Sequence, residues 1–384
     1  MKKYLRVLSY ILTAAAAAAI AFTAARCTQP GTNKLDELKA LIDERFIGDY
    51  DDTEVLDAAA DAMVEALGDR WSYYIAADDY AAYQEQMANA YVGIGVTISA
   101  AEDGSGMEIL SVTAGSPALE AGLQAGDIIT AADGTGLAGA TPTEAKNLVR
   151  GEEGTEVMLT IRRDAEEIQV SVVRRELRTQ VASGQLLEGN IGLVKIENFD
   201  SRCADESIAA IEELLADGAE ALIFDVRWNP GGYASELVEL LDYLLPEGDL
   251  FRTVDYAGNE HTDRSDADCL DIPMAVLVNG SSYSAAEFFA AALSEYEAAV
   301  TVGEQTCGKG YFQNTFKLSD GSAVGLSVGK YYTPKGNNLA GVGITPDIVI
   351  EVDDETAAMI YSGLLDPEED PQIRAAVEAL AGQN

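Results

Sequence analysis

Residues 274–293 read MAVLVNGSSYSAAEFFAAAL: an apolar run, a glycine, three serines in four positions, and then a stretch rich in alanine and phenylalanine. The apolar run is typical of a buried β-strand, and the second half predicts a helix over 285–296. The preceding segments repeat this alternation, with helices predicted over 205–215 and 234–245. The expected strands are IGLVKIENF, ALIFDVR, MAVLVN and AVTVG. Apolar strands separated by helices predict an α/β fold with a mostly parallel sheet covered on both faces.

The serines of this stretch are candidates for a nucleophile. A strand, a glycine and then serines that open a helix would raise a hydroxyl above the edge of the sheet. Ser281 or Ser282 could instead simply cap the helix. A nucleophilic serine also needs a base, and the chain has one histidine, His261, in the polar segment GNEHTDRSD. We interpret that segment as a mobile surface loop, so a histidine base is hard to place and a lysine becomes the alternative.

Lys309 is the candidate lysine, in the segment TCGKGYFQ directly after the strand AVTVG. A lysine base must be neutral, so its pKa has to fall from about 10.4 toward 7, which requires roughly 4 kcal/mol of desolvation. The net charge of −40 acts against this, but the neighbours Cys307, Tyr311 and Phe312 are compatible with burial. Gln313, four residues on, would share the side of Lys309 and could orient its amine.

The segment WNPGG, residues 228–232, follows the strand ALIFDVR and opens the helix at Ala234. Two glycines before a helix leave free N–H groups at the positive end of the helix dipole, which suits an anion or an oxyanion. A plain tight turn is an equally good interpretation of the segment alone. Because ligands bind at the carboxyl ends of parallel strands, we expect this turn and the serines at the same edge of the sheet.

The composition excludes some classes of binding partner. With 65 acidic and 25 basic residues the folded part would repel nucleic acid and anionic lipid, so we exclude both as its partners. The four cysteines have no metal-ligand spacing, and no metal or organic cofactor is expected. We expect isolated small core residues, although a pair between Cys203 and Cys269 stays open. A homo-oligomer is also left open.

The start of the chain resembles an export segment. Basic residues in MKKYLR precede an uncharged run over 7–25. This pattern predicts a signal peptide or a membrane anchor over 1–27, followed by a linker over 28–34. Whether the segment is cleaved or retained stays open. In both cases we expect an extracytoplasmic protein, associated with the membrane if the anchor is kept.

A helical region is predicted over 35–90, with its two helices separated by GDYDDTE and Thr53 as the cap of the second. The following region, 91–177, has short β-type runs and a helix predicted over 142–149. Its central stretch, SPALEAGLQAGDIITAADG, resembles a PDZ domain. Such a module binds an extended peptide beside its sheet and holds the terminal carboxylate with backbone N–H groups.

The resemblance places the carboxylate loop at VGIGV. Its candidate binding residues are Gly93, Ile94, Gly95 and Val96, because glycines allow consecutive amides to face one anion. Two glycines beside a strand, taken alone, would be only a turn. With the surrounding motif we favour a peptide-binding loop.

Five further motifs, in order, resemble the carboxyl-terminal processing peptidases, a family of tail-specific serine proteases: FDVRWNPGG, VNGSSYSAAEFFAAAL, VGEQTCGKGYFQ, YYTPKG and GVGITPD. The resemblance implies that Ser284 is the nucleophile, Lys309 the general base and Gln313 the residue that orients it. It implies an oxyanion hole of Ala285 with Gly231 or Gly232. It also implies that the PDZ domain gates the site.

We therefore expect a multidomain α/β (α+β) protein with a protease core over 178–353 and a helical tail over 354–384. The expected activity is that of an exported serine endopeptidase that binds apolar carboxyl-terminal tails of protein substrates. Two alternatives remain. One is a catalytically silent PDZ scaffold, and the other is a hydrolase of small esters or peptides.

Overall fold

The computed structural model describes residues 33–164 and 166–382, and these form two units, one ending at Ala59 and the other beginning at Ala60. The predicted signal peptide or anchor over 1–27 and most of the predicted linker over 28–34 lie outside the described residues. Within the described part, no helix combines the length and apolar character needed to cross a membrane.

In the N-terminal unit, α2 (Lys34–Arg45) begins with a capping box in which Asn33 accepts hydrogen bonds from the amides of residues 35 and 36. Such a cap satisfies amides that have no partner inside the helix. α3 (Asp52–Glu65) runs into the second unit. Its first turn is capped by Asp51, which accepts from the Glu54 amide at 3.0 Å, so the prediction of Thr53 as the cap was wrong.

The region predicted as helical also contains a strand. After α3 come β1 (Tyr73–Ile75) and then α4 (Ala77–Met87). β1 pairs antiparallel with β18, where Tyr73 lies opposite Gly325. A Cβ on that glycine would come within 2.3 Å of the Tyr73 ring. The strand thus depends on a distant partner without a side chain, which local periodicity could not reveal.

The β-rich module is a sheet in the order β3-β4-β5-β7-β8, with β6 beside β5. Its strands are β3 (Val96–Ala100), β4 (Met107–Val112), β5 (Ile128–Ala132), β6 (Thr135–Gly136), β7 (Glu156–Arg163) and β8 (Glu166–Val173). Its helices are α5 (Pro117–Glu120) and α6 (Pro142–Val149). A separate ribbon of β2 (Ala90–Gly93) and β9 (Arg175–Arg178) flanks the module in the chain. β3 forms one edge of the sheet and contacts α6, so an open strand edge lies beside a helix.

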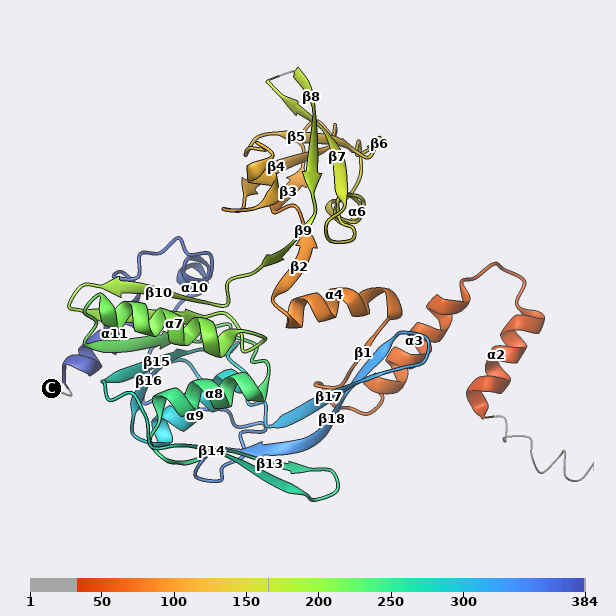
Figure 1. The fold of residues 1–384 in the computed structure, drawn as a ribbon. Coiled ribbons are helices and arrows are strands. Elements are labelled where there is room, and N and C mark those ends of the chain that lie inside the picture. Colours follow the sequence, from red (N-terminus) through yellow and green to blue (C-terminus); the bar gives the residue numbers. More distant parts are fainter. Residues whose placement is uncertain (1–32, 165, 383–384) are drawn as a thin grey trace, which may run out of the picture. The chain divides into compact units, whose positions relative to one another are not determined.

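The predicted α/β core is confirmed as a sheet in the order β10-β11-β12-β15-β16-β19 (Figure 1). Its strands are β10 (Ala182–Leu187), β11 (Ile191–Ile196), β12 (Ala221–Asp225), β15 (Met274–Val278), β16 (Ala299–Gly303) and β19 (Ile348–Val349). All neighbours are parallel except β10 and β11. Every residue of β12 and β15 is buried, as expected for strands covered on both faces.

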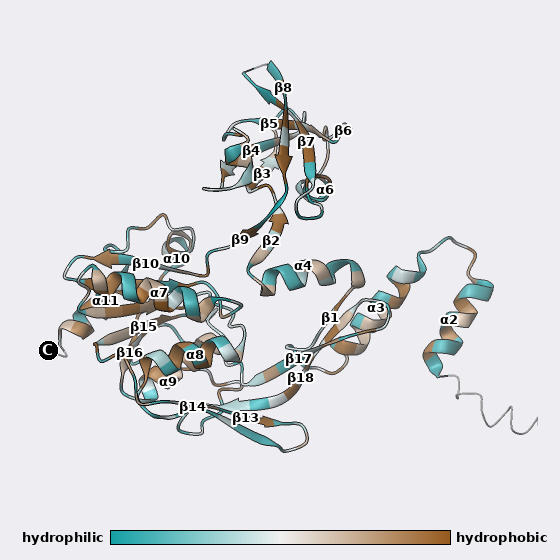
Figure 2. Ribbon diagram, in the orientation of Figure 1, coloured by the Kyte–Doolittle hydropathy of each residue, from teal (hydrophilic) through white to brown (hydrophobic). Residues whose placement is uncertain are grey.

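Helices cover both faces of this sheet. α7 (Cys203–Ala216), α8 (Ala234–Leu244) and α9 (Ala285–Glu295) share one hydrophobic core cluster, and α11 (Pro371–Ala381) belongs to the cluster on the other side. Figure 2 shows hydrophobic and hydrophilic residues along α7 and α8, as expected for helices with one buried face. The sheet therefore has two separate cores, and the C-terminal helix completes one of them.

A second, antiparallel sheet follows the order β1-β18-β13-β14, with β17 paired to β18. Its further strands are β13 (Gly248–Asp255), β14 (Glu260–Ser265), β17 (Tyr311–Lys317) and β18 (Ala323–Tyr332). His261 lies on β14, opposite Thr253, so the interpretation of its segment as a mobile loop was wrong. The polar sequence forms a strand because its backbone hydrogen bonds to β13, while its side chains, except that of Ser265, remain at least partly exposed.

The described cysteines are all free thiols. Cys203 is buried in the core at the start of α7, as expected of a small core residue. Cys269 is exposed, which corrects the expectation for that position. The Cys203–Cys269 pair that the sequence left open is not formed.

The tail consists of α10 (Asp354–Tyr361) and α11. Asp370 caps α11 and also accepts a hydrogen bond from Arg227 Nη1 at 2.8 Å. Nε and Nη2 of that guanidinium donate to Asp225, and all three side chains are buried. The tail is therefore tied to the residue that precedes the WNPGG turn.

Candidate active site

The three serines between β15 and α9 have three different environments. Ser281 is exposed. Ser282 is fully buried, donates to the Val226 carbonyl at 2.7 Å and accepts from the Asn279 amide at 3.0 Å. Ser284 is partly buried and has φ +59° and ψ −125°, in the region that non-glycine residues rarely adopt. Strained backbone at a strand-to-helix turn is typical of a nucleophilic serine, so the geometry favours Ser284.

The hydroxyl of Ser284 accepts a hydrogen bond from the hydroxyl of Tyr331 at 3.1 Å. Tyr331 is 4% exposed and packs against Phe288, with ring centroids 4.3 Å apart. Burial raises the pKa of the Tyr331 hydroxyl well above its ordinary value, so this group stays a neutral donor. Sequence reasoning assigned no role to Tyr331, although it lies in the motif YYTPKG.

Lys309 lies among aromatic rings. Its Nζ is 4.9 Å from the ring centroid of Trp71 and 5.8 Å from that of Tyr283. Burial lowers the pKa of Lys309 to about 8, while the carboxylates of Asp69 and Glu287 act in the opposite direction. Desolvation thus outweighs the acidic surroundings. The resulting pKa suits a base that works near neutral pH.

Glu287, in the first turn of α9, connects the serine and lysine segments. Its carboxylate is fully buried and accepts from the Thr306 hydroxyl at 2.5 Å, the Gly308 amide at 2.7 Å and the Lys309 amide at 2.8 Å. It also accepts from the Ser284 amide at 3.2 Å. Burial raises the pKa of Glu287, and these donors counteract the rise. One carboxylate therefore fixes the main chain at both candidate catalytic residues.

The glycine turn lies against the serine. Gly231 has φ +86°, and a Cβ there would come within 2.7 Å of Ser284 Cβ and 2.8 Å of the Ala285 amide nitrogen. The Gly231 amide already donates to Asn229 Oδ1 at 2.8 Å. Among the described residues, nothing accepts a hydrogen bond from the amides of Gly232 and Ala285. Of the predicted oxyanion donors, these two are therefore the ones that can bind a new anion.

Gln313 lies on β17, but its side-chain amide is hydrogen-bonded to groups other than Lys309. It donates to the Tyr311 carbonyl at 3.2 Å and to the Ser327 hydroxyl at 2.9 Å. No hydrogen bond between Gln313 and Lys309, or between Lys309 and Ser284, occurs in the part of the chain that the structure describes. The orienting role of Gln313 stays a prediction.

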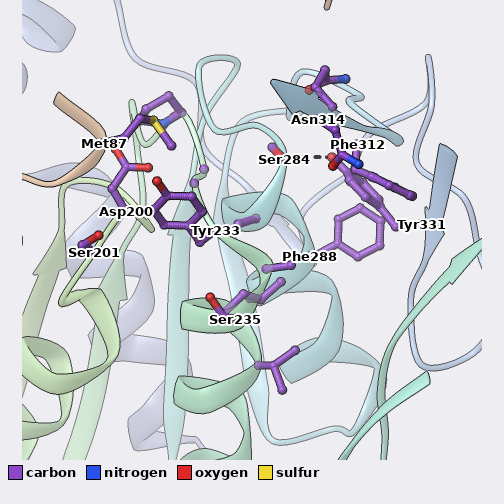
Figure 3. A pocket seen from close by; sticks show the side chains of 18 of the residues that line it. Met87, Asp200, Ser201, Tyr233, Ser235, Ser284, Phe288, Phe312, Asn314 and Tyr331 are labelled. Carbon is purple, nitrogen blue, oxygen red and sulfur yellow. Dashed lines mark hydrogen bonds between the residues drawn. The ribbon is translucent and has the colours of Figure 1, made fainter. Parts of the chain in front are cut away.

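These groups line one cavity of about 1240 Å³ (Figure 3). The predicted residues in its wall are Ser284, Ala285, Gly231, Gly232, Lys309 and Gln313, and Tyr331 joins them. His261 also lines the cavity, but it is exposed and its Nε2 is hydrogen-bonded to Asp263 at 3.0 Å. Over the described ranges, no group of three or more His, Cys, Asp or Glu residues is arranged to hold a metal ion.

The predicted peptide-binding loop joins β2 to β3. Gly95 has φ +84°, and a Cβ there would come within 2.3 Å of Ser116 Cβ, so this position requires glycine. Ile94 is 3% exposed and belongs to the core of the module. Its side chain is therefore covered by the module itself, and its predicted contact with a peptide stays a prediction. The amides of Ile94 and Gly95 have no acceptor among the described residues, which leaves two adjacent donors next to Val96, where the edge strand β3 begins.

Comparisons with known proteins agree with the motifs. Residues 190–350 match peptidase family S41, and residues 108–163 match the PDZ domain. A probable CtpA-like serine protease of Staphylococcus aureus (strain COL) is 30% identical over 84% of this chain and 65% of its own length. A probable CtpA-like serine protease of Staphylococcus saprophyticus is 30% identical over 83% of the chain and 65% of its own length. The chain thus spans less than two thirds of the length of these curated relatives.

Among solved structures, the photosystem II D1 C-terminal processing protease is 26% identical over 83% of this chain and 87% of its own, with a TM-score of 0.47. We conclude that the chain contains a peptidase family S41 domain and a PDZ domain, which confirms its predicted resemblance to the carboxyl-terminal processing peptidases.

Proposed function

We propose that this protein is a serine endopeptidase in which Ser284 is the nucleophile and Lys309 the general base. The observation that carries the proposal is the cavity they share: a serine on strained backbone and a desolvated lysine with a pKa of about 8. A neutral amine can accept the hydroxyl proton, whereas an ammonium cannot.

In the proposed reaction, Ser284 Oγ transfers its proton to Lys309 Nζ and attacks the substrate carbonyl carbon. The amides of Gly232 and Ala285 hold the oxyanion. The protonated lysine then gives its proton to the leaving amine, and water hydrolyses the acyl-enzyme. Lys309 must reach Ser284 Oγ when substrate binds, since such hydrogen bonds often form only in the complex. The Ser284 hydroxyl would then donate to Lys309 Nζ and still accept from the Tyr331 hydroxyl.

The PDZ domain would supply the substrate. An extended carboxyl-terminal tail can add to the open edge of β3, with its carboxylate on the free amides of Ile94 and Gly95. A C-terminal apolar side chain would lie between β3 and α6, which are in contact. We propose further that the chain is exported and works outside the cytoplasm, on the basis of the sequence pattern over 1–27.

Cleavage of a reporter protein tests the proposal. An unfolded reporter with an apolar carboxyl tail is incubated with the wild-type chain, Ser284→Ala or Lys309→Ala, and the products are identified by mass spectrometry. Ser281→Ala and Lys317→Ala are matched controls, because both positions are exposed. We expect cleavage by the wild type and both controls, and a loss of at least about 1000-fold in the two site variants.

Cleavage by Ser284→Ala at the wild-type rate would refute the nucleophile. If the wild type fails to cleave but binds the tail, the catalytically silent scaffold becomes the better interpretation. Cleavage of small esters without cleavage of the reporter would favour the small-substrate hydrolase.

A further inference from the structure

The carboxyl group of Asp200 is a buried acid that the proposed reaction does not use. Asp200 is 5% exposed and lines the same cavity as Ser284. Its amide donates to Asn198 Oδ1, yet within the described chain its carboxyl group has neither a hydrogen bond nor an ion pair. Buried carboxyl groups nearly always have such partners. Among the described residues, no fully buried side-chain oxygen or nitrogen lacks a hydrogen-bond partner, so the unbonded oxygens of Asp200 open into the cavity, where a group from outside the chain can reach them.

The position of Asp200 relative to the reaction is fixed by main-chain hydrogen bonds. The amide of Phe199 donates to the Gly231 carbonyl at 2.8 Å, and the amide of Tyr233 donates to the Phe199 carbonyl at 2.7 Å. Gly231 in turn touches Ser284. Figure 3 shows Asp200 beside Tyr233 at one side of the cavity and Ser284 at the other. A substrate that crosses this turn to reach the serine would bring a nearby side chain to Asp200.

The charges around the cavity favour a cation at this position. The other carboxylates in its wall belong to Glu239, Asp242 and Asp263, whereas Lys309 must be neutral to act as a base. His261 is already paired with Asp263. Among the described residues of the wall, Lys309 is the one lysine and there is no arginine, so a cation beside Asp200 would come from the substrate.

Burial also affects the protonation of Asp200. It raises the pKa of Asp200 to about 7, and the carboxylate of Glu236 on α8 adds to the rise. The other titratable groups that interact with Asp200 are Tyr233, Tyr283 and Cys203, none of which is positively charged. An ammonium or guanidinium group would stabilise the ionised carboxylate, which no group of the described chain does.

We propose that Asp200 is a specificity-determining residue that pairs with a lysine or arginine side chain of the substrate near the scissile bond. This inference rests on the proposed endopeptidase activity. The pairing would take place in the cavity and is separate from recognition of the tail by the PDZ domain.

A lysine scan tests it. Peptides with the sequence around a cleaved bond of the reporter carry lysine or methionine at one position at a time, on both sides of that bond. Values of kcat/KM at pH 8 are compared for the wild type, Asp200→Asn and the control Glu239→Gln, which alters an exposed carboxylate of the same wall. We expect lysine to be preferred about tenfold or more at one position, since hydrogen bonds to charged groups have that magnitude.

Asp200→Asn should abolish this preference and retain the rate on the methionine peptide, whereas Glu239→Gln should keep the preference. The preference of the wild type should also shrink at pH 6, where Asp200 is protonated. The titration of Lys309 affects both peptides equally and cancels in the ratio. Equal rates on lysine and methionine at every position, or a preference that survives in Asp200→Asn, would overturn the inference. No cleavage of any peptide by the wild type would overturn the proposed activity and the inference with it.

Discussion

Replacement of Asp370 by alanine and by asparagine should destabilise the protease core by different amounts, because this side chain has two roles. Asp370 accepts hydrogen bonds from the Gln372 amide at 2.8 Å and the Ile373 amide at 3.3 Å, and so caps α11. It also accepts from Arg227, which is 4% exposed. Alanine removes both roles. Asparagine keeps a capping oxygen but removes the charge.

The expected fall in the free energy of unfolding follows from these contacts. Loss of a cap costs about 1 kcal/mol, and loss of a hydrogen bond to a charged group costs about 2 kcal/mol. Arg227 would still be paired with Asp225, at 2.6 Å, so no isolated buried charge is created. We therefore expect the free energy of unfolding to fall by about 3 kcal/mol for Asp370→Ala and by about 2 kcal/mol for Asp370→Asn.

Tryptophan fluorescence during urea unfolding can measure this change locally. The chain has two tryptophans, so Trp71→Phe leaves Trp228 as the reporter. The Trp228 ring centroid is 5.6 Å from that of Tyr361 on α10 and 5.7 Å from the guanidinium of Arg227, so its emission depends on the docked tail. Equal losses for the two variants, or losses below about 0.5 kcal/mol, would refute this account of Asp370.

Three further outcomes are expected. The rate of cleavage should rise about tenfold per pH unit up to about pH 8 and then level off, because Lys309 acts as a base only when neutral and its pKa is about 8; a flat profile from pH 6 to 9 would exclude that role. Glu287→Gln should reduce kcat at least 100-fold, since an amide NH₂ would face donors such as the Thr306 hydroxyl. Glu287→Asp is the control that preserves the charge, and an unchanged kcat in Glu287→Gln would contradict this role of the carboxylate. Gly231→Ala should abolish cleavage while circular dichroism remains native, because its Cβ would come within 2.7 Å of Ser284 Cβ; wild-type activity would show that the turn can move away.

The sequence predicted the elements of this protein well where the pattern is local. The helix predicted over 142–149 has those bounds in the structure, and the helix predicted over 285–296 ends one residue earlier. The sequence-based prediction missed the strands β1 and β14, whose residues become strands only through pairing with β18 and β13. A polar segment around His261 gives no periodic signal, and its pairing with β13 is decided by the hairpin as a whole.

The same division applies to the candidate site. Motif order alone predicted Ser284 at the start of a helix and Lys309 after a strand, because a strand, a glycine turn and a helix are specified by neighbouring residues. The tertiary structure alone decided what surrounds them: Tyr331 on the serine hydroxyl and Trp71 beside the amine. It alone also placed the carboxyl group of Asp200 in the cavity wall, without a hydrogen bond to any of the described residues. Burial and hydrogen bonding depend on segments that are distant in the chain, and these two quantities set the protonation states on which the chemistry depends.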